Sequence, residues 1–113
     1  MTETEFLDLA DSTLAAIESA LDRLTDEDRI DVECSRNGNV LEIEFLHNGS
    51  KVIVNSQAAM QEMWLAARSG GFHYRYVDGK WVDTRDGTDL FDALSQVTTE
   101  QAGSGPVVVS PQS

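Results

Sequence analysis

The sequence has few of the features that mark secreted or membrane proteins. It contains a single cysteine, Cys34, so no disulfide can form within the chain. No run of 18 apolar residues occurs, which argues against a membrane-spanning helix. The first twelve residues lack the basic and apolar regions of a secretory signal. These absences predict a cytoplasmic protein with no membrane partner.

Positive charge is also scarce. Eight Lys and Arg residues stand against 20 Asp and Glu residues, which gives a formal net charge of −12. Because proteins bind nucleic-acid phosphates through Lys and Arg, we expect no nucleic-acid partner. The acidic balance favours cations or basic protein surfaces instead.

Motifs of catalysis are missing as well. The sequence has no glycine-rich phosphate loop, no HExxH and no nucleophile elbow. His47 and His73 are isolated in sequence and are expected to be structural or solvated, because metal sites usually gather several ligands. Cys34 has no second cysteine and no nearby base, so an inert thiol is expected. The sequence therefore predicts a protein that is not an enzyme.

The residues that are present predict one folded domain with a helix near each end. The chain has 113 residues, of which 41% are hydrophobic. Apolar residues at steps of three and four predict a helix from Phe6 to Leu24, with acidic residues on its opposite side. A second helix is predicted over residues 88–101, with Thr88 as its N-cap. The acidic side of the first helix comprises Asp8, Asp11, Glu18 and Asp22.

The middle of the chain reads as antiparallel strands. Residues 30–34, 40–46 and 50–56 alternate in polarity and are separated by the turn sequences RNGN and HNGS. Residues 72–77 and 81–84 follow as further strands. The order of elements predicts an α+β two-layer sandwich, with a single domain over residues 1–102 and a C-terminal tail over 103–113. Whether the valines of that tail pack on the core stays open.

Residues 57–68 allow two interpretations. Ala, Met, Gln and Glu favour a helix, whereas EMWLAA can also form a short strand. In a strand, Met63 and Leu65 would face the core, and Glu62, Trp64 and Ala66 would face outward. Trp64 could then anchor a partner, although a buried Trp is as common. Trp81, after a tight turn, is most simply a core residue.

Acidic residues are concentrated at the start of the chain. Residues 1–33 hold eleven Asp or Glu against two Arg, a net of −9, while the other 80 residues hold nine against six, a net of −3. Exposed carboxylates of this kind can bind hard cations weakly and without much selectivity. They can equally dock on a basic protein patch, or form a solvated face with no partner. The candidate metal ligands are Glu18, Asp22, Asp26, Glu27, Asp28, Asp31 and Glu33.

Several strings occur in an order that resembles the bacterial frataxins, the CyaY-type iron-sulfur cluster assembly proteins. They are EFLDLAD, DRLTDEDRIDVE, NGSKVIVNSQ, MWLAARSGG and GKWVDTRDG. No single string is decisive, but their order and spacing together are specific. The resemblance covers nearly the whole chain.

The resemblance implies two terminal helices packed on one face of an antiparallel sheet, and hence a strand at MWLAA. It implies weak binding of iron, as Fe²⁺ or Fe³⁺, through acids of the first helix and first strand, and no catalytic site. It also implies docking on the cysteine desulfurase and the iron-sulfur scaffold protein, with a role in regulating cluster assembly. A monomer is expected, with iron-dependent oligomers as an alternative state. The implied partner-binding residues are Asp11, Glu18, Asp22, Asn55, Gln57 and Trp64.

The sequence departs from the family pattern at two places. Ala58 and Ala59 follow Gln57 where a proline is usual, and Glu62 stands where many relatives have Gln. The acid run is interrupted by Ser19, Arg23, Thr25 and Arg29, which predicts a lower affinity for iron. Two other functions stay open, namely an iron-storage or iron-oxidising protein and an acidic interaction module without a metal role.

Overall fold

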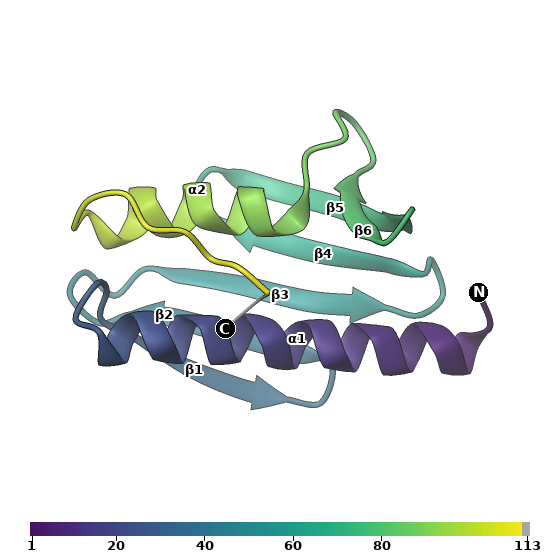
Figure 1. Ribbon diagram of the computed structural model, residues 1–113, viewed down its shortest axis with the longest axis horizontal. Coiled ribbons are helices and arrows are strands. Elements are labelled where there is room, and N and C mark those ends of the chain that lie inside the picture. The colour runs from purple at the N-terminus through teal and green to yellow at the C-terminus, as the bar shows by residue number, and fades with distance from the viewer. Residues whose placement is uncertain (112–113) are drawn as a thin grey trace.

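The computed structural model describes residues 1–111 and has two layers (Figure 1). One layer is a six-stranded antiparallel sheet in which the strands follow one another in chain order. Both helices lie side by side over one face of this sheet, which leaves the other face open. The expected α+β sandwich is therefore confirmed. The elements are α1 Glu3–Asp26, β1 Val32–Asn37, β2 Val40–Phe45, β3 Lys51–Gln57, β4 Glu62–Ala67, β5 Gly70–Val77, β6 Lys80–Asp83 and α2 Leu90–Ala102.

A reciprocal cap starts α1. The Thr2 side chain accepts a hydrogen bond from the Glu5 backbone N–H, and the Glu5 side chain accepts one from the Thr2 N–H. Both bonds satisfy N–H groups that the first turn of a helix leaves unpaired. The Glu5 carboxylate also suits the positive end of the helix dipole. The long helix that follows places one apolar stripe on the sheet and one acidic side in solvent.

β4 resolves the ambiguity of residues 57–68 in favour of a strand. Met63 and Leu65 are buried against the helices, while Trp64 points to the open face. The backbone of β4 pairs with β3 on one side and with β5 on the other. The helix propensities of ordinary residues differ by only a few tenths of a kcal/mol per residue, about the size of the local preference here. The two ladders of hydrogen bonds and the two buried side chains of β4 outweigh this preference.

The prediction of the N-cap of α2 is wrong by one residue. The helix begins at Leu90, and Asp89 is its N-cap, with a side chain that accepts from the N–H groups of Phe91 and Asp92. Thr88 instead donates its backbone N–H to the Asp86 carboxylate, in the turn before the helix. Asp and Thr are both good N-caps, so the turn geometry decides between them.

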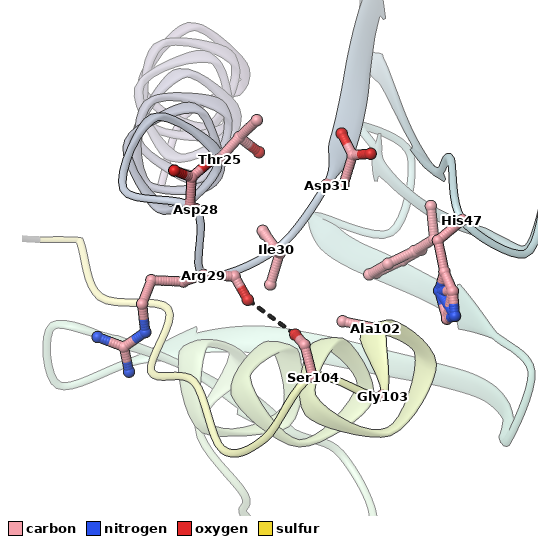
Figure 2. A pocket seen from close by; sticks show the side chains of 10 residues that line it. Thr25, Asp28, Arg29, Ile30, Asp31, His47, Ala102, Gly103 and Ser104 are labelled. Atoms are coloured by element: carbon pink, nitrogen blue, oxygen red, sulfur yellow. Dashed lines mark hydrogen bonds between the residues drawn. The ribbon is translucent and has the colours of Figure 1, made fainter.

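The C-terminal tail packs on the domain. Val107 and Val109 are buried, whereas Val108 between them is 74% exposed. The Thr99 hydroxyl accepts from the Val107 N–H, and the Ser95 hydroxyl accepts from the Val109 N–H, so the tail runs back along α2. Ser104 donates a further hydrogen bond to the Arg29 carbonyl (Figure 2). The domain boundary at residue 102 stays a prediction.

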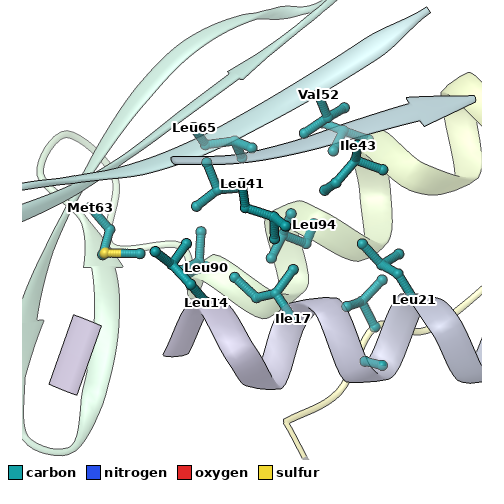
Figure 3. Close-up of a cluster of buried hydrophobic side chains, with 14 of the residues drawn as sticks. Leu14, Ile17, Leu21, Leu41, Ile43, Val52, Met63, Leu65, Leu90 and Leu94 are labelled. Carbon is teal, nitrogen blue, oxygen red and sulfur yellow. The ribbon is translucent and has the colours of Figure 1, made fainter. Parts of the chain in front are cut away.

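Aliphatic side chains from the sheet and both helices meet in one core (Figure 3). The residues drawn there include Leu14 and Ile17 from α1, Leu41 from β2 and Leu94 from α2. Trp81 is buried at one end of this core, as expected, and its indole N–H donates to the Thr13 hydroxyl over 3.0 Å. Within residues 1–111, neither helix combines the length and apolar content that crossing a membrane requires.

Candidate functional site

The acidic residues surround the C-terminal half of α1 and the loop that leads to β1. α1 ends in a Schellman-type turn, because the Arg29 N–H donates to the Leu24 carbonyl and the Asp28 N–H donates to the Thr25 carbonyl. Asp28 adopts the left-handed conformation that this turn requires, with φ at +58°. The turn presents the side chains of Asp26, Glu27 and Asp28 to solvent.

Three of the predicted metal ligands lie along one shallow groove on α1. Glu18, Asp22 and Asp26 follow one another at successive helical turns and line this groove. Glu18 is half-buried, and the other two are exposed. Arg23 also lines the groove. The helix therefore aligns Glu18 and Asp22, which periodicity predicts to share one side, with Asp26 one turn further on.

The helix that carries the groove packs against the edge strand β1. Burial raises the pKa of the Cys34 thiol to about 12, and the negative charges of Asp22 and Glu18 contribute to this shift. Cys34 is thus protonated at neutral pH, in agreement with the expected inert thiol. Asp22 and Glu18 therefore lie near enough to the helix-facing side of β1 to disfavour a thiolate there.

A pocket of about 510 Å³ continues the acidic region beyond the end of α1 (Figure 2). Asp28 and Asp31 line it, together with His47 from the turn after β2. Ala102 at the C-terminal end of α2 also lines the pocket, so the negative ends of both helix dipoles meet here. The pocket is therefore electronegative, although Arg29 contributes one positive charge to its lining.

Glu33 lies apart from the other predicted metal ligands. Its neighbours Val32 and Cys34 face the helices, so alternation places Glu33 on the open face of the sheet. There it stands directly opposite Glu44 of β2. We use the term acidic surface for the six residues that remain together on the helix side and in the loop, which are Glu18, Asp22, Asp26, Glu27, Asp28 and Asp31.

The carboxylates of the acidic surface form no ion pair within the described part of the chain, although Arg23 and Arg29 line the same groove and pocket. Among residues 1–111, none of the six has a Lys, Arg or His nitrogen within 4.0 Å. Asp11, a predicted partner-binding residue, differs because Arg36 of β1 pairs with it. Within the same residues, no group of three His, Cys, Asp or Glu side chains is arranged to hold a metal ion. The acidic surface is an open array of charges.

The other predicted partner-binding residues meet on the open face of the sheet. In the strand register, Asn55 of β3 lies opposite Trp64 of β4, and Trp64 lies opposite His73 of β5. The neighbouring row contains Gln57, Glu62 and Arg75. Trp64 is half-buried, and its ring stacks on that of His73 with centroids 4.4 Å apart and planes 7° apart.

The burial of Glu62 differs from what an outward-facing strand position predicts. Glu62 shares the open face with Trp64, as alternation predicted, but it is only 3% exposed. One carboxylate oxygen accepts from the Trp64 indole N–H over 2.9 Å, and the other accepts from Arg75 Nε over 3.1 Å. His73 Nδ1 lies 3.5 Å from the first oxygen. We call Glu62, Trp64, His73 and Arg75 the Glu62 cluster.

The cluster keeps the Glu62 carboxyl ionised. Burial alone would raise its pKa, but the hydrogen bonds from Trp64 and Arg75, and the charges of Arg75 and His73, outweigh burial and lower the pKa. Sequence reasoning treated His73 as isolated and did not single out Arg75. Cross-strand register is the signal that could have found them, since both lie directly opposite β4 residues.

Comparison with known proteins identifies the family. A frataxin-like domain matches residues 1–104. The iron-sulfur cluster assembly protein CyaY of Janthinobacterium sp. (strain Marseille) is 58% identical over 109 residues, which cover 96% of each chain. The protein of the same name from Bordetella petrii is 58% identical over 109 residues, 96% of this chain and 98% of the relative.

Solved structures agree with this assignment. A frataxin from Psychromonas ingrahamii has a TM-score of 0.80 and 32% identity, with full coverage of both chains. Trimeric frataxin from the yeast Saccharomyces cerevisiae, complexed with ferrous iron, has a TM-score of 0.71 and 25% identity over 91% of this chain and 88% of that one. Fold, family match and full-length similarity together show that the chain belongs to the frataxin-like family.

Proposed function

We propose that this protein binds iron weakly through its acidic surface and takes part in regulating iron-sulfur cluster assembly. The observation that carries the proposal is the acidic surface itself, six carboxylates in the second half of α1 and the loop after it that form no ion pair among residues 1–111. Proteins named for iron-sulfur cluster assembly share more than half of this sequence. The fold holds the six carboxylates together, and their negative charge would bind the iron.

Iron chemistry suits this arrangement. Carboxylate oxygens are hard ligands that suit hard cations such as Fe³⁺, and they also bind the softer Fe²⁺. Glu18 and Asp22 lie one helical turn apart and are the best pair to share an ion. Exposed ligands on a helix surface leave most of the coordination to water, so we expect weak binding and exchange with solvent. Glu33 faces the other side of the sheet and is the weakest member of the predicted ligand set.

Docking on the cysteine desulfurase would use the same charges. A concentrated negative field speeds encounter with a basic patch, and its effect falls with salt. The scaffold protein would contact the open face of the sheet, around Asn55, Gln57 and Trp64. Because iron and the desulfurase would share the acidic surface, iron occupancy would change docking, which gives the protein a regulatory role.

Binding measurements with charge-matched variants test the proposal. The double variant Glu18→Gln/Asp22→Asn removes two charges from the groove, and Asp78→Asn/Glu100→Gln removes two exposed charges elsewhere. The first should weaken desulfurase binding in titration calorimetry at least tenfold at low salt, and weaken iron binding in parallel. The second should change both by less than twofold. Equal effects of the two variants would refute a specific role for the groove.

Iron storage or iron oxidation is the second candidate. The similarity to a trimeric yeast frataxin complexed with ferrous iron favours testing it. Iron storage predicts larger species in sedimentation after Fe²⁺ is added in air, together with oxygen consumption. A regulatory role predicts a monomer under anaerobic conditions and no catalytic oxygen uptake.

A further inference from the structure

Glu62 occupies an unusual position for a surface carboxylate. It lies on the solvent side of β4, yet only 3% of it is exposed, because Trp64 and its cross-strand neighbours cover it. Burying a charge is costly unless it is paired and hydrogen-bonded. The hydrophobic core does not require this charge, since the core lies on the opposite face of the sheet.

Both oxygens of Glu62 are engaged in fixing surface side chains. One binds the indole N–H of Trp64, and the other binds Nε of Arg75, at 2.9 and 3.1 Å. A hydrogen bond to a charged acceptor is stronger than a neutral one. The Trp64 ring is held further by its stack on His73. Glu62 therefore determines how an aromatic ring and a guanidinium are presented on the open face.

Fixed side chains lose less entropy when a partner binds. A rigid Trp and a rigid Arg are the residue types that most often dominate binding energy at an interface. Arg75 uses Nε for Glu62, and its side chain stays 62% exposed, so its guanidinium remains accessible to a partner. That guanidinium fits a carboxylate beside an apolar side chain that packs on Trp64.

The charge pattern of the open face fits the same kind of partner. Glu33, Glu42 and Glu44 lie on β1 and β2, at one side of this face, where Lys51 of β3 pairs with Glu42 over 3.6 Å. Arg75 and Lys80 lie on β5 and β6, at the other side. A partner with a carboxylate near Arg75 and basic residues over β1 and β2 is therefore complementary to the whole face.

We infer that Glu62 is a positioning residue, whose buried carboxylate fixes Trp64 and Arg75 and so preforms a platform for an apolar partner segment that carries a carboxylate. The inference deepens the proposed function and rests on it for the identity of the partner. It explains how a carboxylate is accommodated at a position that is only 3% exposed.

Two variants at one position separate the roles of Glu62. Glu62→Gln retains an oxygen for the Trp64 indole but loses the charge that holds Arg75, and Glu62→Ala loses both. Glu44→Gln is the control, because it removes one negative charge from the same face of the sheet. Amide NMR spectra first establish that each chain is folded.

The direct readouts are the Trp64 indole and Arg75 Nε–H signals. In Glu62→Ala the chemical shifts of both signals should move toward those of mobile side chains. In Glu62→Gln only the chemical shift of Arg75 Nε–H should move in this way. In Glu44→Gln neither chemical shift should change. If Glu62→Ala does not fold, the Arg75 signal of Glu62→Gln decides. Unchanged signals in the Glu62 variants would overturn the inference.

Affinity for a bacterial iron-sulfur scaffold protein is the second readout. The side-chain entropy lost on ordering Trp64 and Arg75 corresponds to about tenfold in affinity, so Glu62→Ala should bind about tenfold more weakly. Glu100→Gln, which removes an exposed charge from α2 in the helix layer, should bind about as well as wild type. Equal affinity of wild type and Glu62→Ala would refute the platform. If the wild type does not bind the scaffold protein, the proposed contact between that protein and the open face of the sheet is wrong. The NMR signals still test the positioning role of Glu62 in that case.

Discussion

At the scale of single residues, Asp28 retains an unfavourable conformation at the end of α1. Its left-handed backbone is one that glycine adopts without cost, and most other residues adopt at a cost of about 1 kcal/mol. Its negative charge also lies at the negative end of the helix dipole. On both counts Asp28 is less favourable for stability than glycine would be at this position.

We predict that Asp28→Gly stabilises the protein. Relief of the left-handed strain and of the dipole repulsion should raise the free energy of unfolding by about 0.5–1 kcal/mol. Urea unfolding monitored by circular dichroism measures the change. Asp28→Asn is the matched control, since it removes only the charge. If Asp28→Gly is less stable than wild type, the strain argument is wrong.

Glu62 gives a prediction for the pH dependence of stability. Its pKa is lower in the folded protein than the unfolded value of about 4.5, so its ionised form stabilises the fold fully above that value. This stabilisation is lost as the pH falls through the lowered folded-state pKa. Glu62→Gln should therefore cost about 1–2 kcal/mol at pH 7, within the range for hydrogen bonds to charged groups. The difference between wild type and variant should shrink below pH 4.5.

Denaturant unfolding of both chains between pH 3 and pH 7 checks this. Glu44→Gln, on the same face, reports the general effect of removing one negative charge. A wild-type advantage over Glu62→Gln that grows as the pH falls from 4.5 would contradict the assignment.

At the scale of elements, the tail is held by alternate valines. Val109→Ala removes buried methyl groups and should cost about 2 kcal/mol. Val108→Ala, at an exposed position in the same segment, should change stability by less than about 0.5 kcal/mol. Thermal unfolding of the two variants tests this. Equal values would mean that the tail does not contribute to the core.

The elements also show what sequence can and cannot predict. The apolar period of α1 and the Asn-Gly turns predict the first helix and hairpins, because those signals are local. Trp64 and its neighbours form a strand against local propensity, because pairing with β3 and β5 decides the matter. That interpretation came from the resemblance and not from residue types.

The candidate site shows the same difference between features that local sequence predicts and features that depend on strand pairing. Glu18 and Asp22 share a groove, as helical periodicity predicts, and the groove extends to Asp26 because the helix continues two residues beyond Leu24. The burial of Glu62 could not be predicted in this way, because its partners His73 and Arg75 come from the next strand. Sequence proximity groups Glu33 with the helix acids, although strand alternation places it on the other face.

At the scale of the whole molecule, negative charge is concentrated at one end and destabilises the fold. Asp26 and Glu27 lie at the negative end of α1, where each anion costs about 0.3–1 kcal/mol at low salt. Asp26→Asn/Glu27→Gln should therefore raise the free energy of unfolding by about 1 kcal/mol in dilute buffer. The gain should fade in 0.5 M NaCl because salt screens exposed charges. A gain that is independent of salt would contradict the electrostatic explanation.

The most direct test of the central claim is an amide NMR titration with Fe²⁺ under anaerobic conditions, with Ca²⁺ as a control for generic carboxylate binding. Shifts or losses of signal confined to the acidic surface, with Asn55 and Trp64 unaffected and weaker effects from Ca²⁺, are the predicted result. Unchanged signals of the acidic surface at millimolar Fe²⁺ would contradict iron binding there.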